Sequence, residues 1–411
     1  MIGASAVRIG ALVRWTVGVL ALAALPCAIC AQQTSARGVV FADANGNGVR
    51  DRSERGLQGV AVSNQETVVV TDSTGAFSLP VGQSGLIFVS VPDGYAAVGT
   101  FWRKVSTSDA PIAFPLRAQR QPRTFSFVDA SDPHVGPASV ERMRRFRAMD
   151  DSLHPAFTLL AGDLVRDAMS VSDSEAASYF DMVSGEIARF KESVWTVPGN
   201  HDHFGIIRSR SHVEVNHPMF GRRMYQHYFG PDYYSFTYGG VHFIGMNSVQ
   251  RDDSAYYGRI DSVQMAWLER DLALVPASEP VVTFMHIPLV SAWFNVLGYI
   301  DMPLVSDVVH INGKTDYRHT VGNVQEVLHA LEKHNYPLAI GAHTHAAERL
   351  SFETNGQMTR FEQSSAIVGP AQAGPMIVPS GFTLYTVHDG VIDAGKFIPL
   401  DPPHAGARAV P

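Results

Sequence analysis

Five apolar, strand-like runs between residues 123 and 350 each end in a short polar motif. The runs are TFSFVDAS, AFTLLA, SVWTVP, VVTFM and PLAI, and the motifs that follow them are Asp132-Pro-His134, Gly162-Asp163, Gly199-Asn-His-Asp202, Met285-His286 and Gly341-Ala-His-Thr-His345. Side chains just beyond the carboxyl ends of strands converge on one crevice in open α/β sheets. The pattern therefore predicts an α/β layered domain in which these polar side chains share one site.

Helix-like segments alternate with these strands. SVERMRRFRAMDDSL places Val140, Met143 and Phe146 on one face, and VQEVLHALEKH repeats apolar residues in the same way. Asp261-Ser-Val-Gln264 is a variant of the capping box that opens a helix. YYSFTYGGVHFIGMNS indicates a β-hairpin turning at Gly239-Gly240. We expect an α/β domain over residues 123–350 and a short β-rich region over 351–411.

The first 31 residues have the features of a secretory signal. Arg8 and Arg14 precede the apolar run VGVLALAAL, and the small residues Ala28 and Ala31 follow it. The run is shorter than the ~20 residues needed to cross a bilayer, although a membrane anchor is the alternative. We expect a periplasmic or secreted protein without a transmembrane segment in the mature chain. Both cysteines, Cys27 and Cys30, lie in this segment, so cleavage would leave no thiol.

Short β-like runs separated by turn residues fill positions 37–118 and predict a small all-β sandwich. Its opening segment, from Asp43 to Glu54, has the spacing of an EF-hand calcium loop, with Gly48 at the sixth position. The expected calcium ligands are Asp43, Asn45, Asn47, Val49 (through its carbonyl), Asp51 and Glu54. A polar surface turn is the alternative interpretation.

The strand-end motifs contain carboxylates, one asparagine and several imidazoles, which are more donors than a single ion needs. Mixed nitrogen and oxygen ligands without thiolates suit Mn, Fe or Zn better than calcium. Two such ions about 3.5–4 Å apart are a recurring device for phosphoester hydrolysis.

In order and in kind, the five motifs resemble those of the calcineurin-like metallophosphoesterase family, over roughly residues 123–350. The resemblance implies a layered αββα sandwich and a nucleophilic hydroxide that bridges two metals. One metal would be held by Asp132, His134, Asp163 and His345, and the other by Asp163, Asn200, His286 and His343. His201 would protonate the leaving group, and Asp202 would hydrogen-bond and orient its imidazole. Arg166 would contact phosphate oxygens, or else form a surface salt bridge.

At two points the sequence differs from known subfamilies of this family, which makes membership of either subfamily less expected. Purple acid phosphatases carry a tyrosine ligand at the position of Arg166, so no tyrosinate–iron colour is expected. Periplasmic 5′-nucleotidases carry a large C-terminal domain, whereas about sixty residues follow the last motif here.

The leading prediction is thus an exported binuclear-metal phosphohydrolase that cleaves small phosphomonoesters or phosphodiesters. One alternative is a nucleotide or cyclic-nucleotide phosphodiesterase. Another is a catalytically silent surface binding protein stabilised by calcium. The formal net charge is −7, and no basic patch stands out, so a nucleic-acid polymer is not an expected partner. Oligomeric state is not indicated by the sequence.

Overall fold

The computed structural model describes residues 35–105, 111–252, 256–298, 307–311, 313–354, 356–373 and 376–401. The predicted signal segment, with both cysteines, lies outside these residues. The described residues belong to one compact unit. None of their helices combines the length and the apolar character that crossing a membrane requires.

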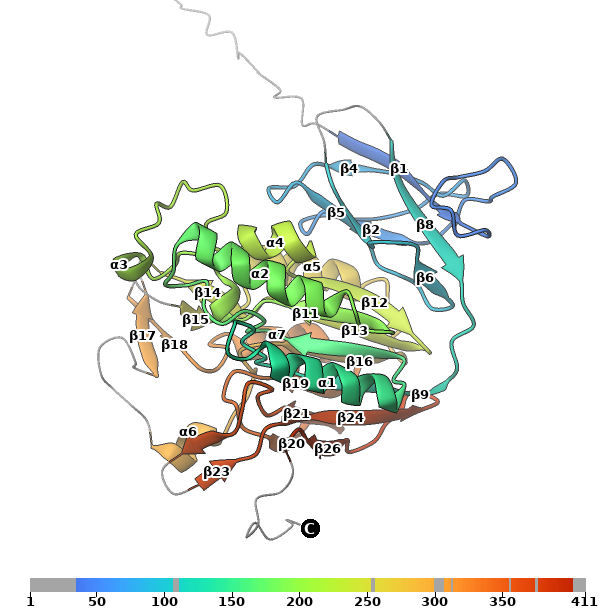
Figure 1. Cartoon of the computed structure of the whole chain (residues 1–411). Helices are drawn as coiled ribbons and strands as arrows, with labels where there is room; N and C mark the ends of the chain where they lie inside the picture. The colour runs from blue at the N-terminus through green and yellow to red at the C-terminus, as the bar shows by residue number, and fades with distance from the viewer. Residues whose placement is uncertain are drawn as a thin grey trace, which may run out of the picture. The chain divides into compact units, whose positions relative to one another are not determined.

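The N-terminal part, residues 35–105 and 111–118, contains two four-stranded β-sheets (Figure 1). Their strand orders are β4-β1-β8-β6 and β3-β2-β5-β7. The strands are β1 (Ser35–Ala42), β2 (Ala61–Ser63), β3 (Val68–Val70), β4 (Ala76–Pro80), β5 (Leu86–Val89), β6 (Tyr95–Ala97), β7 (Trp102–Lys104) and β8 (Ile112–Ala118). Phe77 and Phe114 of one sheet and Phe88 of the other are buried in one core cluster. The predicted all-β architecture of this part is confirmed.

The first sheet of the larger α/β part has the order β11-β10-β9-β24-β25, with β26 paired to β24. Its strands are β9 (Thr124–Ala130), β10 (Phe157–Ala161), β11 (Ser193–Val197), β24 (Gly381–His388), β25 (Val391–Ile392) and β26 (Lys396–Pro399). Strands β9, β10 and β11 run parallel, whereas β24 runs antiparallel to β9. The parallel strands therefore end at the same edge of the sheet.

The second sheet has the order β12-β13-β16-β19-β21-β20. Its strands are β12 (Tyr234–Tyr238), β13 (Val241–Met246), β16 (Pro280–Met285), β19 (Asn335–Gly341), β20 (Glu348–Thr354) and β21 (Gln357–Gln363). The four central strands are parallel, and the edge strands β12 and β20 are antiparallel. The predicted hairpin around Gly239-Gly240 is confirmed as the β12–β13 pair.

The two sheets pack face to face through aromatic side chains. The rings of Phe127 and Phe157 lie 5.4 and 5.0 Å from the ring of Phe243, between centroids. Along β9 the side chains alternate, because Phe127 belongs to this inter-sheet core while Val128 packs with the helices on the outer face. This period of two is the geometry of a strand buried on both faces.

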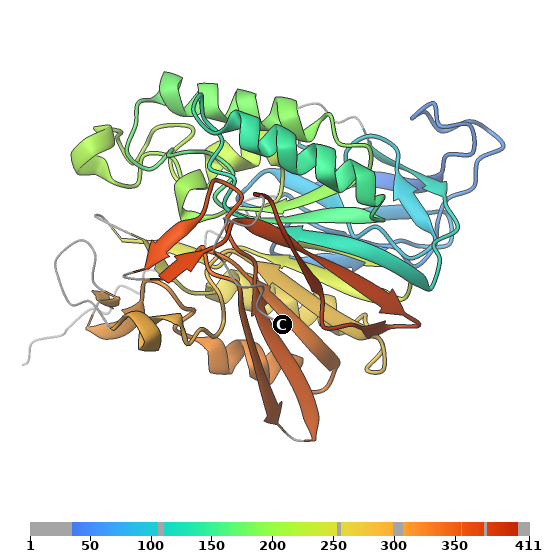
Figure 2. The ribbon, with the colours of Figure 1, turned by 60° about the horizontal axis from the view of Figure 1, so that its bottom comes forward.

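Helices cover the outer faces of both sheets, which completes the predicted αββα sandwich (Figure 2). Helices α1 (Val140–Leu153) and α2 (Asp173–Ile187) bury Phe146 and Phe180 against the first sheet. Helices α5 (Ser262–Leu272) and α7 (Val324–Leu331) pack against the second sheet through Trp267 and Leu331.

The N-terminus of α5 is capped as predicted, since the Asp261 side chain accepts a hydrogen bond from the Gln264 backbone NH at 2.8 Å. The Gln264 side chain does not return to the cap. It pairs instead with both backbone groups of Asn247, so the reciprocal half of the capping box is replaced by a tertiary contact.

Shorter elements lie in the connections between the strands and helices above. They are η1 (Asn200–Asp202), α3 (Arg208–Ser211), α4 (Arg223–Phe229), α6 (Trp293–Leu297), and the paired strands β14 (Val249–Arg251) with β15 (Tyr256–Gly258), β17 (Val308–Ile311) with β18 (Lys314–Tyr317), and β22 (Ala371–Ala373) with β23 (Met376–Val378).

Residues beyond 350 contribute strands to both sheets of the sandwich. Strand β24 lies beside β9 at the centre of the first sheet, and β21 pairs with β19 in the second. The C-terminal region expected from its many glycines and prolines is β-rich, and its strands are integral to the α/β core.

Candidate metal centre

The five sequence motifs meet at the carboxyl ends of the parallel strands. Strands β9, β10 and β11 lead into Asp132, Asp163 and Asn200, while β16 and β19 lead into His286 and the pair His343 and His345. The paired sheets thus bring together side chains that are far apart in the sequence, such as His134 and His345, as the strand-end argument predicts.

The backbone is strained where it turns out of these strands. Among the described residues, nine non-glycine positions have a positive φ, and five of them are Asp132, His134, Asp163, His343 and His345. Such left-handed conformations are unfavourable for residues with a Cβ and persist only where surrounding structure holds them. Because five of these nine residues belong to the strand-end motifs, the fold holds the motif side chains in directions that an unstrained backbone would not give them.

Two glycines of the motifs allow the close approach of the turns. A Cβ on Gly199 would lie 2.2 Å from the Oδ1 of Asp163, and one on Gly162 would lie 2.7 Å from the Cβ of His286. Any larger residue would push the ligand-bearing loops apart.

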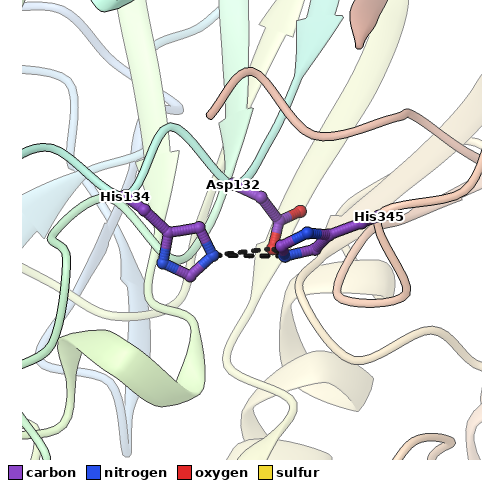
Figure 3. Close-up of side chains that lie close together, drawn as sticks. All are labelled: Asp132, His134 and His345. Carbon is purple, nitrogen blue, oxygen red and sulfur yellow. Dashed lines mark hydrogen bonds and ion pairs between the residues drawn. The ribbon is translucent and has the colours of Figure 1, made fainter. Parts of the chain in front are cut away.

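One cluster consists of Asp132, His134 and His345 (Figure 3). The Nε2 atoms of the two histidines are 3.2 Å apart. The Oδ1 of Asp132 lies 3.2 Å from the Nε2 of His345 and 3.7 Å from that of His134. All three donor atoms point at one small volume, and Asp132 is fully buried.

A second cluster consists of Asp163, His286 and His343. The Nε2 of His286 lies 3.2 Å from the Oδ2 of Asp163 and 3.1 Å from the side-chain oxygen of Asn200. The Nδ1 of His343 lies 3.2 Å from the same Nε2. The Oδ2 of Asp163 is also 3.7 Å from the Nε2 of His134, so this carboxylate lies between the clusters.

The carboxylate and imidazole atoms of the two clusters are suited to binding metal cations. The buried Oδ1 of Asp132 receives no hydrogen bond from the described residues, although it faces two imidazoles. Burial lowers the pKa of His286, yet the carboxylates of Asp163 and Asp132 outweigh burial and raise this pKa to about 9. The two buried carboxylates therefore favour positive charge at His286, although burial lowers the pKa of His134 and of His343. The nitrogen and oxygen donors of the clusters are those that Mn, Fe and Zn accept.

His201 lies at the edge of the site. Its side chain is 28% exposed, and its Nε2 is 4.0 Å from the Oδ2 of Asp163. Its ring meets that of His134 edge-on, with 4.6 Å between centroids. It is more exposed than the buried His286 and stands further from Asp163, which suits a group that faces an incoming substrate.

The prediction that the Asp202 carboxylate accepts a hydrogen bond from the His201 imidazole is wrong. The Nδ1 of His201 pairs with the backbone carbonyl of Arg166 at 2.7 Å. The Asp202 carboxylate instead accepts backbone NH hydrogen bonds from Leu164, Val165 and Gly199, at 3.1, 3.0 and 2.7 Å. Asp202 thus ties together the two loops that carry Asp163 and Asn200.

The surroundings of Asp202 also affect its charge. Burial raises the pKa of its carboxyl to about 7, the nearby negative charge of Asp163 adds to this rise, and the three backbone NH groups act in the opposite direction. Asp202 has 0% exposed surface, so its role is within the protein rather than toward a substrate.

The side chain of Arg166 is exposed, while its backbone carbonyl supports His201. His203, the unmatched histidine nearest to the motifs, is buried and pairs through Nδ1 with the Gly199 carbonyl at 2.8 Å. Asp129, on β9, is buried and accepts a hydrogen bond from Ser364. Burial raises the pKa of Asp129 to about 7.

The sequence motifs did not predict His319 and Tyr256, which both contact His343. The Nδ1 of His319 is 2.7 Å from the Nε2 of His343, and the Tyr256 ring meets the His343 ring at 90°. Both residues lie in connections without a recognisable motif, so no local pattern marks them.

The predicted calcium loop forms a compact turn after β1. Its buried Asp43 accepts backbone NH hydrogen bonds from Gly46 at 2.7 Å and Gly48 at 2.8 Å, and both glycines have positive φ. The remaining predicted ligands pair with one another or stand in solvent: the Asp51 carboxylate accepts from the amides of Asn45 and Asn47, the Glu54 carboxylate accepts from the Asp51 backbone, and Val49 is exposed.

The fold and the paired ligand clusters define a metal-dependent hydrolase. Residues 127–347 match the sequence profile described as Calcineurin-like phosphoesterase, and residues 44–119 match the one described as N terminal of Calcineurin-like phosphoesterase. The chain belongs to the calcineurin-like phosphoesterase family, and it is a metal-dependent phosphoesterase. No curated protein matches the chain.

Several solved structures are similar to it. A dimetal phosphatase from Danio rerio shares 14% identity over 64% of this chain and 93% of its own, with a TM-score of 0.44. A purple acid phosphatase from yellow lupin (Lupinus luteus) seeds shares 13% over 83% and 68%, with a TM-score of 0.43. GAP50, the anchor in the inner membrane complex of Plasmodium, shares 12% over 67% and 85%, with a TM-score of 0.40.

Proposed function

We propose that the protein is an exported binuclear phosphohydrolase for small phosphomonoesters or phosphodiesters. The observation that carries the proposal is the position of Asp163, whose Oδ2 lies 3.7 Å from His134 of one cluster and 3.2 Å from His286 of the other. A carboxylate in that position can bridge two cations.

In this proposal, one ion is held by Asp132, His134, Asp163 and His345. The other ion is held by Asp163, Asn200, His286 and His343. Mn, Fe or Zn would suit these ligands. When bound, the ions would activate water and neutralise phosphoryl oxygens.

The chain's own groups would complete the chemistry. The Arg166 carbonyl accepts the Nδ1 proton of His201, which leaves Nε2 directed to the site. In its doubly protonated form, His201 would donate the Nε2 proton to the departing oxygen of the ester and become neutral. The exposed guanidinium of Arg166 would contact phosphate oxygens.

Hydrolysis of p-nitrophenyl phosphate and of bis-p-nitrophenyl phosphate tests this proposal, with Mn²⁺, Zn²⁺ or Fe²⁺ added to metal-free protein. We expect metal-dependent turnover of at least one ester, and the ratio of the two rates separates monoesterase from diesterase. A preference for cyclic or linear nucleotides over both would favour the nucleotide phosphodiesterase alternative. Protein that binds two ions but cleaves none of these esters would instead be the silent binding protein.

Export is proposed from the signal-like segment at 1–31. Its removal would be detected as a new N-terminus near residue 32 in protein recovered from the periplasm or the medium. An intact N-terminus on membrane-associated protein would support the anchor alternative.

We also propose that the loop from Asp43 to Glu54 binds calcium with a structural role. The inward carboxylate of Asp43 and the positive φ of Gly46 and Gly48 support a turn that can wrap an ion. Calcium should raise the unfolding temperature, and Glu54→Gln should abolish the rise without altering metal content at the catalytic clusters. An equal rise in Glu54→Gln would contradict calcium binding by this loop.

A further inference from the structure

His343 is held at both ring nitrogens, and only one of them faces the proposed metal site. Its Nδ1 points inward, 3.2 Å from the Nε2 of His286. Its Nε2 points outward and lies 2.7 Å from the Nδ1 of His319. His319 belongs to the segment between β18 and α7, outside the five motifs.

If His343 binds a metal through Nδ1, these contacts determine which ring nitrogens of His343 and His319 carry a proton. A metal-binding Nδ1 carries no proton, so the proton of neutral His343 resides on Nε2 and is donated to the Nδ1 of His319. The proton of His319 then resides on its own Nε2. That atom lies 3.4 Å from the Oδ1 of Asp307, a buried carboxylate. Along the series from His343 to His319 to Asp307, each ring proton thus faces a nitrogen or oxygen atom.

Packing holds His319 in this position. Its ring stacks on Phe294 of α6 at 4.7 Å between centroids, and lies at 25° to the ring of His343 at 4.9 Å. The backbone NH of the adjacent Arg318 donates to the Asp307 carbonyl at 2.9 Å, which keeps the carboxylate beside the imidazole.

The matching histidine of the same cluster is supported differently. The outer nitrogen of His286, its Nδ1, pairs with the backbone carbonyl of Ala161 at 2.8 Å, within the sheet core. The support for His343 comes from the side chain of another histidine in a connecting segment. A side chain can be changed without disturbing a strand, so this support can be tested directly.

We propose that His319, backed by Asp307, is a positioning residue that fixes the tautomer and ring direction of His343 and thereby sets the affinity for one of the two ions. This inference rests on the proposed ligand assignment. Groups that orient metal-binding histidines typically contribute a 10–100-fold factor in metal affinity.

The test compares His319→Leu, His319→Asn and Phe294→Leu in the full chain. Leucine removes the acceptor for His343. Asparagine can place its side-chain oxygen near the former Nδ1 and keep that acceptor. Phe294→Leu removes the stacking partner and leaves the hydrogen bond. Mn²⁺ binding to metal-free protein is measured by calorimetry, and metal content by mass spectrometry.

We expect wild type to bind two ions, and His319→Leu to bind one of them about 10–100-fold more weakly. His319→Asn should recover most of the lost affinity, and Phe294→Leu should retain both ions. Unfolding midpoints of the metal-free variants should be similar. Equal binding by wild type and His319→Leu would overturn the inference, as would equal losses in all three variants.

Failure of the proposed function has a different signature. If wild type itself did not bind two ions, or if Asp163→Ala retained both, the ligand assignment would be wrong before His319 is considered. Loss of a single ion in His319→Leu, with two bound in wild type, supports the inference whatever ester the protein cleaves.

Discussion

The Nδ1 of His201 and the backbone carbonyl oxygen of Arg166 are 2.7 Å apart, and this contact holds a partly exposed imidazole at the edge of the candidate metal centre. Because the acceptor is a main-chain atom, the direction of His201 does not depend on a neighbouring carboxylate. Through its backbone carbonyl, Arg166 orients the His201 imidazole independently of any contact that its own side chain makes.

His201→Ala should retain both metals and lose turnover. General acid catalysis typically contributes 10²–10⁴-fold, and the loss should be largest for esters with poor leaving groups, such as alkyl phosphates. Metal analysis together with kcat for p-nitrophenyl and alkyl phosphates measures both effects. Loss of one ion in this variant would show that His201 is a ligand.

Arg166→Ala separates the side chain from the backbone at the same position. The carbonyl that accepts from His201 remains, so the metal content and the dependence on the leaving group should match wild type. A raised KM would indicate that the guanidinium contacts phosphate. An unchanged KM would leave Arg166 as a surface residue.

Asp202→Asn should destabilise the protein, because one of the two side-chain oxygens that accept three backbone NH groups would become an NH₂ group. Leaving a buried donor unpaired costs about 1–3 kcal/mol, measurable as a lower free energy of unfolding in urea. The dependence of rate on the leaving group should resemble wild type. If Asp202→Asn changed the dependence of rate on the leaving group as His201→Ala does, Asp202 would act on the His201 imidazole directly, as the motif predicts.

Asp163→Ala should lose both ions and nearly all turnover, because its carboxylate lies between the two clusters. Asp93→Ala removes an exposed carboxylate from the N-terminal part and is the matched control. It should keep both ions and full activity. Retention of one tightly bound ion in Asp163→Ala would contradict a bridging role.

Asp150→Asn tests a buried carboxyl on α1. Burial raises the pKa of Asp150 to about 6, from 3.8, although Thr158 donates to it at 2.7 Å. A raised folded-state pKa means that the stabilising contribution is fully present below pH 3.8 and is lost as the pH rises through 6. Two pKa units correspond to about 3 kcal/mol.

The difference in unfolding free energy between Asp150→Asn and wild type should therefore shift in favour of the variant between pH 4 and pH 7. Thr158→Val removes the hydroxyl that stabilises the charged form, so it should make the pH dependence steeper. A difference independent of pH would contradict the raised pKa.

Gln65→Ala should weaken the attachment of the N-terminal part to the α/β sandwich. The side-chain NH₂ of Gln65 donates to the Oδ1 of buried Asp232 at 3.0 Å and to the backbone carbonyl of Tyr233 at 3.2 Å, and both bonds are lost in the variant. The backbone carbonyl of Gln65, which accepts from the Tyr233 hydroxyl at 2.6 Å, remains. We expect a loss of about 1–3 kcal/mol in unfolding free energy. Gln83→Ala, at an exposed position of the same part, should have little effect.

Much of this fold is visible in local patterns. The period of apolar residues predicts α1 and α7, and Asp261 caps α5 as its position indicates. The placement of β24 is different, because nothing within residues 381–388 specifies β9 as its neighbour. Its partner β9 is far away in the sequence, so the pairing is decided by the tertiary arrangement of the sheet.

The sequence by itself determined which residue types stand at the strand ends, and the regular geometry of parallel strands then brings Asp132, Asp163 and His286 to one edge. Only the tertiary structure decided what supports them. Asp202 turned out to bind backbone NH groups, and His319 turned out to hold His343, because both contacts depend on how connecting segments fold back over the sheets. Strand periodicity determines the direction of a side chain locally, whereas hydrogen-bond partners distant in the chain are determined by packing.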